Sequence, residues 1–309
     1  MRIIFMGTPE FAVASLDALV KAGMDVIAVV TAPDKPAGRG RQLSASAVKQ
    51  YAVQQHIKVL QPEKLKNEVF LSELKNLEAD LQVVVAFRML PEVVWGMPPK
   101  GTINLHASLL PQYRGAAPIN WAVINGEHET GVSTFFLKQE IDTGDIILTD
   151  KTSIPETDTA GDVHDKLMQI GAALLVKTVR MIENNTYQEV SQSELIMPDE
   201  TSVVLKRAPK IFKDDCLINW MQPTDQVYNF IRGLSPYPTA FTAFNHKILK
   251  IFSSEKQRAE PSIAPGGFIT DHKTVLKFAC TDGFILVKEV QLEGKKRMSV
   301  GEFLRGIKL

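Results

Sequence analysis

The chain has 309 residues, of which 45% are hydrophobic and 23% charged, and its 35 Lys and Arg balance 35 Asp and Glu, as in an ordinary globular protein long enough for two domains. It contains no apolar stretch near the roughly 20 residues of a membrane span and no signal-peptide pattern, so we expect a cytoplasmic protein. Two isolated cysteines, Cys216 and Cys280, and six histidines without metal-ligand spacing exclude a disulfide framework and a zinc cluster, and we predict no metal.

The first part of the chain alternates short apolar runs with helical patterns. Residues 11–22 have the apolar spacing of a helix. Strands are predicted at residues 2–6, 26–31, 81–86 and 102–105. Such alternation is typical of an α/β domain with a doubly wound, mainly parallel sheet. A helix predicted at residues 161–183 closes this domain, which we place at residues 1–188, and a polar linker follows at residues 189–204.

Gly7, Thr8 and Pro9 follow the first predicted strand, where a glycine-rich turn would bind a dinucleotide. No Gly-x-Gly-x-x-Gly pattern is present, and Pro9 interrupts the turn. The sequence therefore favours a tight turn that lines a binding site over a dinucleotide-binding loop.

Residues 34–46 carry three cations, Lys35, Arg39 and Arg41, and show no apolar periodicity. Such a segment buries too little apolar surface to order itself, so we expect a mobile surface loop. The loop follows the second predicted strand and should lie at the carboxyl edge of the sheet, where ligands bind. Two interpretations remain: a solvated basic loop, or a cationic arm that binds phosphates beside a catalytic cleft.

Asn104 and His106 end a short β-branched run, and because they are two residues apart their side chains should share one face of a strand. Asp142 follows the apolar run 132–137 and begins an Asp-Thr-Gly-Asp turn that could return its carboxylate to His106. An amide and an imidazole could hold a developing oxyanion, while the carboxylate orients the imidazole and helps to carry a proton. Each residue alone is more often structural, but the ordered set indicates an acyl or formyl transferase.

After residue 206 the pattern changes to short strands. They are predicted at residues 241–244, 248–252, 275–279 and 284–291. We therefore predict a small open barrel at residues 205–309. This part has 17 Lys and Arg against 10 Asp and Glu, whereas residues 1–204 have 18 against 25. The asymmetry favours a polyanionic partner bound across both parts, although solubility alone gives differences of this size.

Longer motifs surround these residues. Residues 104–111 are Asn-Leu-His-Ala-Ser-Leu-Leu-Pro, Arg114 begins Arg-Gly-Ala-Ala-Pro, and residues 142–145 are Asp-Thr-Gly-Asp. This ordered set resembles the signature of the folate-dependent formyltransferases. Further segments similar to the members that act on methionyl initiator tRNA lie at residues 3–11, 33–41, 208–211 and 236–238. The resemblance covers nearly the whole chain.

The resemblance implies a Rossmann-like catalytic domain followed by an OB-like, tRNA-binding barrel. It also implies that Asn104, His106 and Asp142 catalyse transfer of the formyl group of 10-formyltetrahydrofolate to the amino group of methionyl initiator tRNA. The implied folate-binding residues are Phe87, Arg88, Met89, Leu90, Ser108, Leu109, Leu110, Pro111 and Ile141. The residues expected to bind tRNA are Gly7, Thr8, Pro9, Arg39, Arg41, Lys206, Lys210, Lys295, Lys296 and Arg297. We expect binding of the tRNA acceptor arm, no membrane association and a monomer.

The segment 86–91, Ala-Phe-Arg-Met-Leu-Pro, departs from the family pattern of Ala-Tyr-Gly, a short aliphatic run and Pro. It is one residue shorter and lacks the glycine, which leaves the pterin contacts open. Two other functions also remain open. One is a formyltransferase acting on an amino sugar nucleotide, or a 10-formyltetrahydrofolate hydrolase; the other is a non-catalytic tRNA-binding protein. The basic Arg39 segment and the basic C-terminal part disfavour the first, and the intact polar triad disfavours the second.

Overall fold

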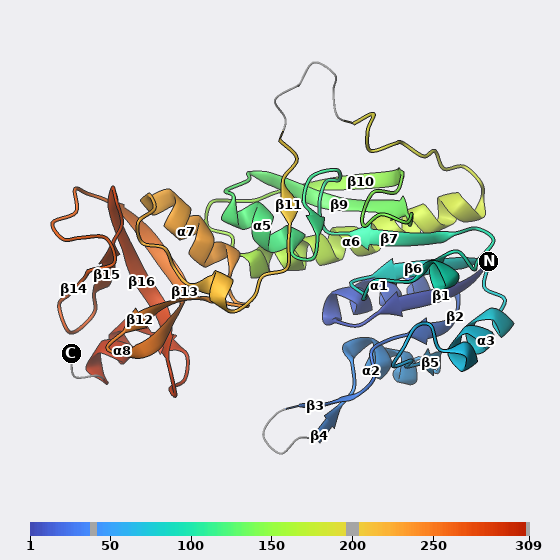
Figure 1. The fold of residues 1–309 in the computed structure, drawn as a ribbon, viewed down its shortest axis with the longest axis horizontal. Helices are drawn as coiled ribbons and strands as arrows, with labels where there is room; N and C mark the ends of the chain where they lie inside the picture. The colour runs from blue at the N-terminus through green and yellow to red at the C-terminus, as the bar shows by residue number, and fades with distance from the viewer. Residues whose placement is uncertain (38–41, 196–203, 307–309) are drawn as a thin grey trace. The chain divides into compact units, whose positions relative to one another are not determined.

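The computed structural model describes residues 1–37, 42–195 and 204–306. Figure 1 shows the elements of the chain, which packs into two compact units. Unit 1 comprises residues 1–114, 131–152 and 165–206, and unit 2 comprises residues 115–130, 153–164 and 207–309. The domain boundaries expected near residues 188 and 204 stay a prediction.

Unit 1 is built on a seven-stranded sheet in the order β10-β9-β7-β6-β1-β2-β5. Neighbours from β7 to β5 are parallel, whereas β9 is antiparallel to β7. The strands span Arg2–Gly7 (β1), Asp25–Val30 (β2), Lys58–Leu60 (β5), Leu81–Val85 (β6), Thr102–His106 (β7), Glu129–Phe136 (β9) and Ile146–Ser153 (β10). The prediction of a mainly parallel sheet is confirmed, and β1, β2, β6 and β7 match the predicted strands closely.

Local sequence explains where the elements of unit 1 begin. The inner strand β1 begins at the exposed Arg2 and continues as an apolar run whose side chains are almost fully buried, as in parallel sheets covered on both faces. Ser46 accepts a hydrogen bond from the Lys49 N–H, and Asn67 accepts one from the Phe70 N–H, so these residues cap α2 and α3. The helices span Glu10–Lys21 (α1), Ala47–Gln54 (α2), Glu68–Asn76 (α3) and Glu92–Trp95 (α4). Helix α6 (Ala160–Glu183) belongs to unit 1 from Asp165 onward.

The segment 34–46, for which we expected a mobile surface loop, contains an antiparallel hairpin of β3 (Lys35–Ala37) and β4 (Gln42–Ser44). The expectation that the segment would not order itself was wrong for these six residues, because two short strands satisfy their backbone groups by pairing with each other and need not bury apolar side chains. Figure 1 shows the hairpin extending away from the sheet, beyond α2. Residues 38–41 lie outside the described part of the chain.

Unit 2 contains an antiparallel sheet in the order β12-β13-β16-β15-β14, with β17 paired to β16. Its strands span Ala240–Phe244 (β12), Lys247–Arg258 (β13), Phe268–Thr270 (β14), Leu276–Ala279 (β15), Gly283–Leu292 (β16) and Met298–Ser299 (β17). The four strands predicted in this part of the chain correspond to β12, β13, β15 and β16, which confirms a small β domain. Two very short strands, β8 (Arg114–Gly115) and β11 (Arg207–Ala208), pair separately.

Helices of unit 2 were not predicted from the sequence, because each offers only two or three turns of apolar pattern. They span Pro118–Ile124 (α5), Thr224–Gly233 (α7) and Val300–Arg305 (α8). The core of the unit includes Trp220, whose ring stacks on that of Phe278 with centroids 4.7 Å apart. Ile231 of α7 and Phe303 of α8 are buried in the same cluster, so both helices are held by apolar packing.

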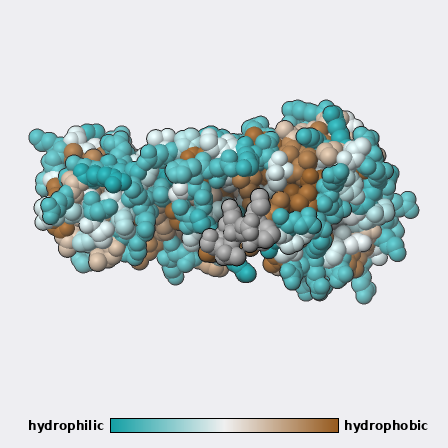
Figure 2. Space-filling view, turned by 90° about the horizontal axis from the view of Figure 1, so that it is seen from above, coloured by the Kyte–Doolittle hydropathy of each residue, from teal (hydrophilic) through white to brown (hydrophobic). Residues whose placement is uncertain are grey.

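Hydrophilic residues cover most of the face drawn in Figure 2, and hydrophobic residues form separate patches on it. Isolated apolar patches are normal on the surface of a globular protein. In the part of the chain that the structure describes, no helix is both long and apolar enough to cross a membrane.

Candidate functional site

The structure brings together the three polar residues expected to act at one site of unit 1. Asn104 and His106 lie on β7, with Asn104 half-buried and His106 only 7% exposed. Asp142 lies in the turn that follows β9, and its Oδ2 is 3.9 Å from Nδ1 of His106. Among the described residues, none forms a hydrogen bond with the Asn104 carboxamide. The predicted return of Asp142 to His106 is thus seen in the geometry, while the catalytic roles stay a prediction.

A backbone carbonyl fixes the orientation of the His106 ring. Nε2 of His106 lies 3.0 Å from the carbonyl oxygen of Tyr113. Because a carbonyl oxygen only accepts hydrogen bonds, Nε2 must carry the proton in this contact. Nδ1, which faces Asp142, is then the nitrogen that can accept or release a proton.

The turn that carries Asp142 is held by Gln192. The Gln192 amide Nε2 donates to the carbonyl oxygens of Asp142 and Gly144, both at 2.8 Å. Its Oε1 accepts from Nε of Arg114 at 2.9 Å and from Nη2 at 2.5 Å. Gln192 is 2% exposed, so these bonds are made away from water. Asp142 itself has φ 53°, a conformation that few non-glycine residues adopt and that surrounding contacts must maintain.

Sequence reasoning missed this role of Gln192. The residue falls in the stretch interpreted as a polar linker, and a single glutamine there carries no periodicity that would indicate burial. Arg114 was noticed only as part of a motif. Its partner lies 78 residues away in the chain, so no local pattern could connect the two.

Replacing Gln192 by leucine should destabilise unit 1. The change removes the two hydrogen bonds to the turn and leaves the Arg114 guanidinium without its buried acceptor, at a cost of about 1–3 kcal/mol. Hydrogen exchange should accelerate in peptides covering residues 142–145, and the free energy of unfolding should fall. Gln188→Leu is the matched control, because Gln188 is exposed in the same segment. Equal exchange in the two variants would contradict a bracing role.

Gly144 permits the turn to approach β9. A Cβ added at residue 144 would lie 1.6 Å from the carbonyl oxygen of Phe136, which no side chain can tolerate without a backbone shift. Gly144 is buried, and its own carbonyl is one of the two groups that Gln192 holds. The glycine of the Asp-Thr-Gly-Asp motif therefore has a steric reason to be there.

The residues expected to bind folate lie in three segments with different exposure. Met89 is 73% exposed and Ile141 58% exposed, whereas Leu90 and Leu110 are buried in apolar clusters. Ser108 is fully buried and donates to the Gln112 carbonyl at 2.7 Å. The remaining members, Phe87, Leu109 and Pro111, are half-buried, and Arg88 is exposed. Core packing accounts for Leu90 and Leu110, and the binding role of the set stays a prediction.

The Arg88 guanidinium does not extend freely from this segment. Its Nη1 donates to the Glu63 carbonyl at 2.9 Å, and its Nη2 donates to the Pro62 carbonyl. It also lies over the Phe87 ring at 5.7 Å. The arginine that departs from the family pattern thus anchors a neighbouring backbone segment.

The residues expected to bind tRNA are distributed over both units. Gly7 ends β1 and leaves no room for a Cβ, which would lie 2.6 Å from that of Ala12, so close packing of α1 on the sheet also explains this glycine. Thr8 is half-buried and Pro9 exposed just before α1. Lys206, Lys210, Lys295, Lys296 and Arg297 are exposed, and Arg297 pairs with Glu289. Arg39 and Arg41 lie outside the described residues.

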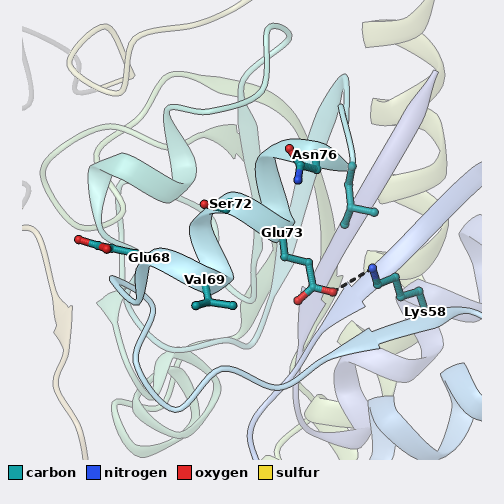
Figure 3. A pocket seen from close by; sticks show the side chains of 7 residues that line it. Lys58, Glu68, Val69, Ser72, Glu73 and Asn76 are labelled. Atoms are coloured by element: carbon teal, nitrogen blue, oxygen red, sulfur yellow. Dashed lines mark ion pairs between the residues drawn. The ribbon is translucent and has the colours of Figure 1, made fainter.

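Other features of the described chain do not add a second site. No group of three or more His, Cys, Asp or Glu side chains in the described residues is placed to bind a metal ion. A surface hollow beside α3 contains none of the expected site residues; Figure 3 shows Glu73 pointing toward Lys58 there, and their ion pair measures 2.9 Å. Exposed ion pairs of this kind contribute only about 0–1 kcal/mol.

Comparisons with known proteins give one consistent result. Residues 1–179 match the family model described as formyl transferase, and residues 210–308 match the model described as formyl transferase, C-terminal domain. The methionyl-tRNA formyltransferases of Bacteroides fragilis and Parabacteroides distasonis are 53% and 55% identical to the chain, in alignments that cover 100% of it and 96% of each relative.

A solved structure shares the fold. The N-formyltransferase from Helicobacter canadensis, in complex with folinic acid and dTDP-3-aminofucose, has a TM-score of 0.66, with 94% of this chain and 98% of that chain covered. Its sequence identity is 22%, so this likeness concerns the fold alone.

Proposed function

We propose that this chain, which belongs to the formyl transferase family, transfers the formyl group of 10-formyltetrahydrofolate to the amino group of methionyl initiator tRNA. The observation that carries this conclusion is identity of 53–55% along the whole chain with enzymes named methionyl-tRNA formyltransferase. The product initiates translation, and a cytoplasmic monomer is the form we propose.

The residues of unit 1 fit a folate donor. Met89 and Ile141 expose large apolar side chains in the segments that follow β6 and β9, and side chains of this kind can pack against the flat faces of a pterin ring, whose polar groups lie along its edge. Asn104, in the middle of β7 and two residues before His106, presents an amide donor. When bound, the donor supplies an electrophilic formyl carbon and a nitrogen leaving group.

The chain's own residues stabilise charge and move one proton. The amino nitrogen forms a bond to the formyl carbon, and the bond from that carbon to the donor nitrogen breaks. Asn104 donates a hydrogen bond to the oxyanion of the tetrahedral intermediate. His106 accepts the proton lost by the amine at Nδ1 and returns it to the leaving nitrogen, while its Nε2–H stays on the Tyr113 carbonyl. Asp142, 3.9 Å from Nδ1, stabilises the transient imidazolium.

Labelled formyl provides the direct test. The purified chain should transfer label from 10-formyltetrahydrofolate to methionyl initiator tRNA without added metal, and should transfer little to an amino sugar nucleotide. If only the sugar nucleotide became labelled, the chain would be a formyltransferase that acts on an amino sugar nucleotide. Release of free formate without a labelled acceptor would indicate a hydrolase.

Arg39→Ala should lower turnover on methionyl-tRNA and leave folate affinity unchanged. An arginine that contacts phosphate contributes about one unit, or slightly less, to the slope of binding against salt. A contact next to the reacting end also positions the acceptor, so rate should fall with affinity. Binding and turnover are measured across a salt series for the parent and the variant. Identical curves would show that the segment is only a solvated basic one.

A further inference from the structure

A cluster of polar side chains holds the base of the β3–β4 hairpin. Asp34 immediately precedes β3, Lys49 lies in the first turn of α2, and Gln61 follows β5. These residues come from separate parts of the chain and meet in unit 1. We call Asp34, Lys49 and Gln61 the hairpin clamp.

Both oxygens of the Asp34 carboxylate are engaged in the clamp. Nζ of Lys49 donates to Oδ2 at 2.5 Å, and Nε2 of Gln61 donates to Oδ1 at 2.8 Å. The same Gln61 nitrogen donates to the carbonyl oxygen of Ala32 at 2.8 Å. The segment that leads from β2 into β3 is therefore fixed both by a side chain and by its backbone.

A second contact joins the two ends of the hairpin segment. The hydroxyl oxygens of Thr31 and Ser46 are 2.7 Å apart, and Thr31 is fully buried. The Thr31 N–H also donates to the Leu60 carbonyl at 3.0 Å, which ties the entry of the hairpin to the end of β5. Hydrogen bonds thus join the two ends of the hairpin segment to each other and to the end of β5.

The Asp34 carboxylate keeps its negative charge, and with it the contacts of the hairpin clamp, at neutral pH. Hydrogen bonding from Gln61 and then from Lys49 lowers the pKa of Asp34 below its ordinary value of 3.8. A carboxyl group whose pKa is lower in the folded state contributes its stabilisation fully above the unfolded pKa, and loses it as the pH falls through the lowered value. Titration between pH 6 and pH 8, well above 3.8, should not open the clamp.

Arg88 binds the backbone just after Gln61. Its guanidinium binds the carbonyl oxygens of Pro62 and Glu63, the two residues after Gln61. The segment 61–63 is therefore held between the hairpin clamp and the segment that follows β6, where folate contacts are expected. One backbone segment links the root of the hairpin to the donor side of the site.

Short hairpins need such support. Each strand of this one has only three residues, and an isolated two-stranded hairpin is marginally stable in water. We propose that the hairpin clamp is a positioning device for the acceptor, in which Asp34, Lys49 and Gln61 set the direction of β3 and β4 against the acceptor arm of tRNA. The inference rests on the proposed function and adds residues that bind neither substrate.

Asp34→Asn tests the clamp with little change in shape. The neutral amide loses the ion pair with Lys49 and cannot accept from both partners as strongly. We expect kcat/KM for methionyl-tRNA to fall by about tenfold to a hundredfold, the scale of a small misplacement of a reacting group. Folate Kd should stay unchanged. Hydrogen exchange should accelerate in peptides covering β3 and β4, but not in those covering β7.

Two further variants separate positioning from folding. Lys49→Met should reproduce most of the Asp34→Asn effect, and the double variant should be little worse than Asp34→Asn alone, because all three lose the same Asp34–Lys49 ion pair. Glu73→Gln is the control: it breaks the exposed Glu73–Lys58 ion pair of Figure 3, and both its kinetics and its exchange should match the parent.

The outcomes distinguish this inference from the proposed function. If the parent formylates methionyl-tRNA and Asp34→Asn does so equally well, the clamp has no positioning role although the function stands. If the parent is inactive on methionyl-tRNA, the proposed function fails and the acceptor role of the clamp fails with it. Unchanged exchange in β3 and β4 on Asp34→Asn would overturn the inference even if activity fell.

Discussion

Replacing His106 by alanine should lower the turnover of formyl transfer about a hundredfold or more, the usual scale for loss of a general acid–base group. The ring is held by the Tyr113 carbonyl at 3.0 Å and faces Asp142 at 3.9 Å, and alanine removes the nitrogen that we propose carries the proton. Turnover is measured with saturating donor and methionyl-tRNA, and folding is checked by circular dichroism. His128→Ala is the control, because His128 is exposed and outside unit 1.

Variants of Asn104 and Asp142 separate the proposed roles of these two residues from that of His106. Asn104→Ala should cost a similar factor through loss of an oxyanion donor. Asp142→Asn keeps the shape of the side chain and removes its charge, so turnover should fall while the fold remains intact. Near-normal turnover of a folded His106→Ala protein would show that the proton travels by another route, and the mechanism would be wrong.

Gly144→Ala should lower the turnover of formyl transfer about as much as His106→Ala, although Gly144 has no side chain that could take part in the chemistry. The added Cβ would lie 1.6 Å from the Phe136 carbonyl oxygen, so the turn must move. That movement displaces Asp142 from His106 and strains the two hydrogen bonds from Gln192. A displacement of about 1 Å is enough to cost roughly a hundredfold in rate. Overpacking should also lower the free energy of unfolding by about 1–3 kcal/mol.

The measurements for Gly144→Ala are turnover, folate Kd and urea unfolding. Gly301→Ala is the matched control. Gly301 lies in α8, and outside the chain neighbours and backbone of that helix the nearest atom to an added Cβ would be Nη1 of Arg305, at 3.5 Å. In a helix this exchange should be neutral or stabilise by about 0.5–1 kcal/mol. Full activity of Gly144→Ala would mean that the turn can relax without moving Asp142, and the steric account of the motif would fail.

The sequence by itself determined the features that repeat locally. Apolar runs placed β1, β2, β6 and β7 closely, and the change to short strands after residue 206 indicated the second architecture. These features follow from side-chain periodicity, which a strand or helix imposes on its own residues. The spacing of Asn104 and His106 likewise follows from one strand, and the motif linked Asp142 to them.

Only the tertiary structure decided which distant residues support the site. Gln192 reaches the Asp142 turn across 50 residues, and Arg88 reaches the Pro62 carbonyl across 26. Gln61 and Asp34 meet across 27 residues at the base of a hairpin, in a segment for which the sequence suggested a mobile surface loop. Each contact is a hydrogen bond from one polar side chain to a backbone carbonyl oxygen or a carboxylate oxygen. Such a bond depends on how separate elements pack, and it leaves no periodic trace in the sequence around either partner.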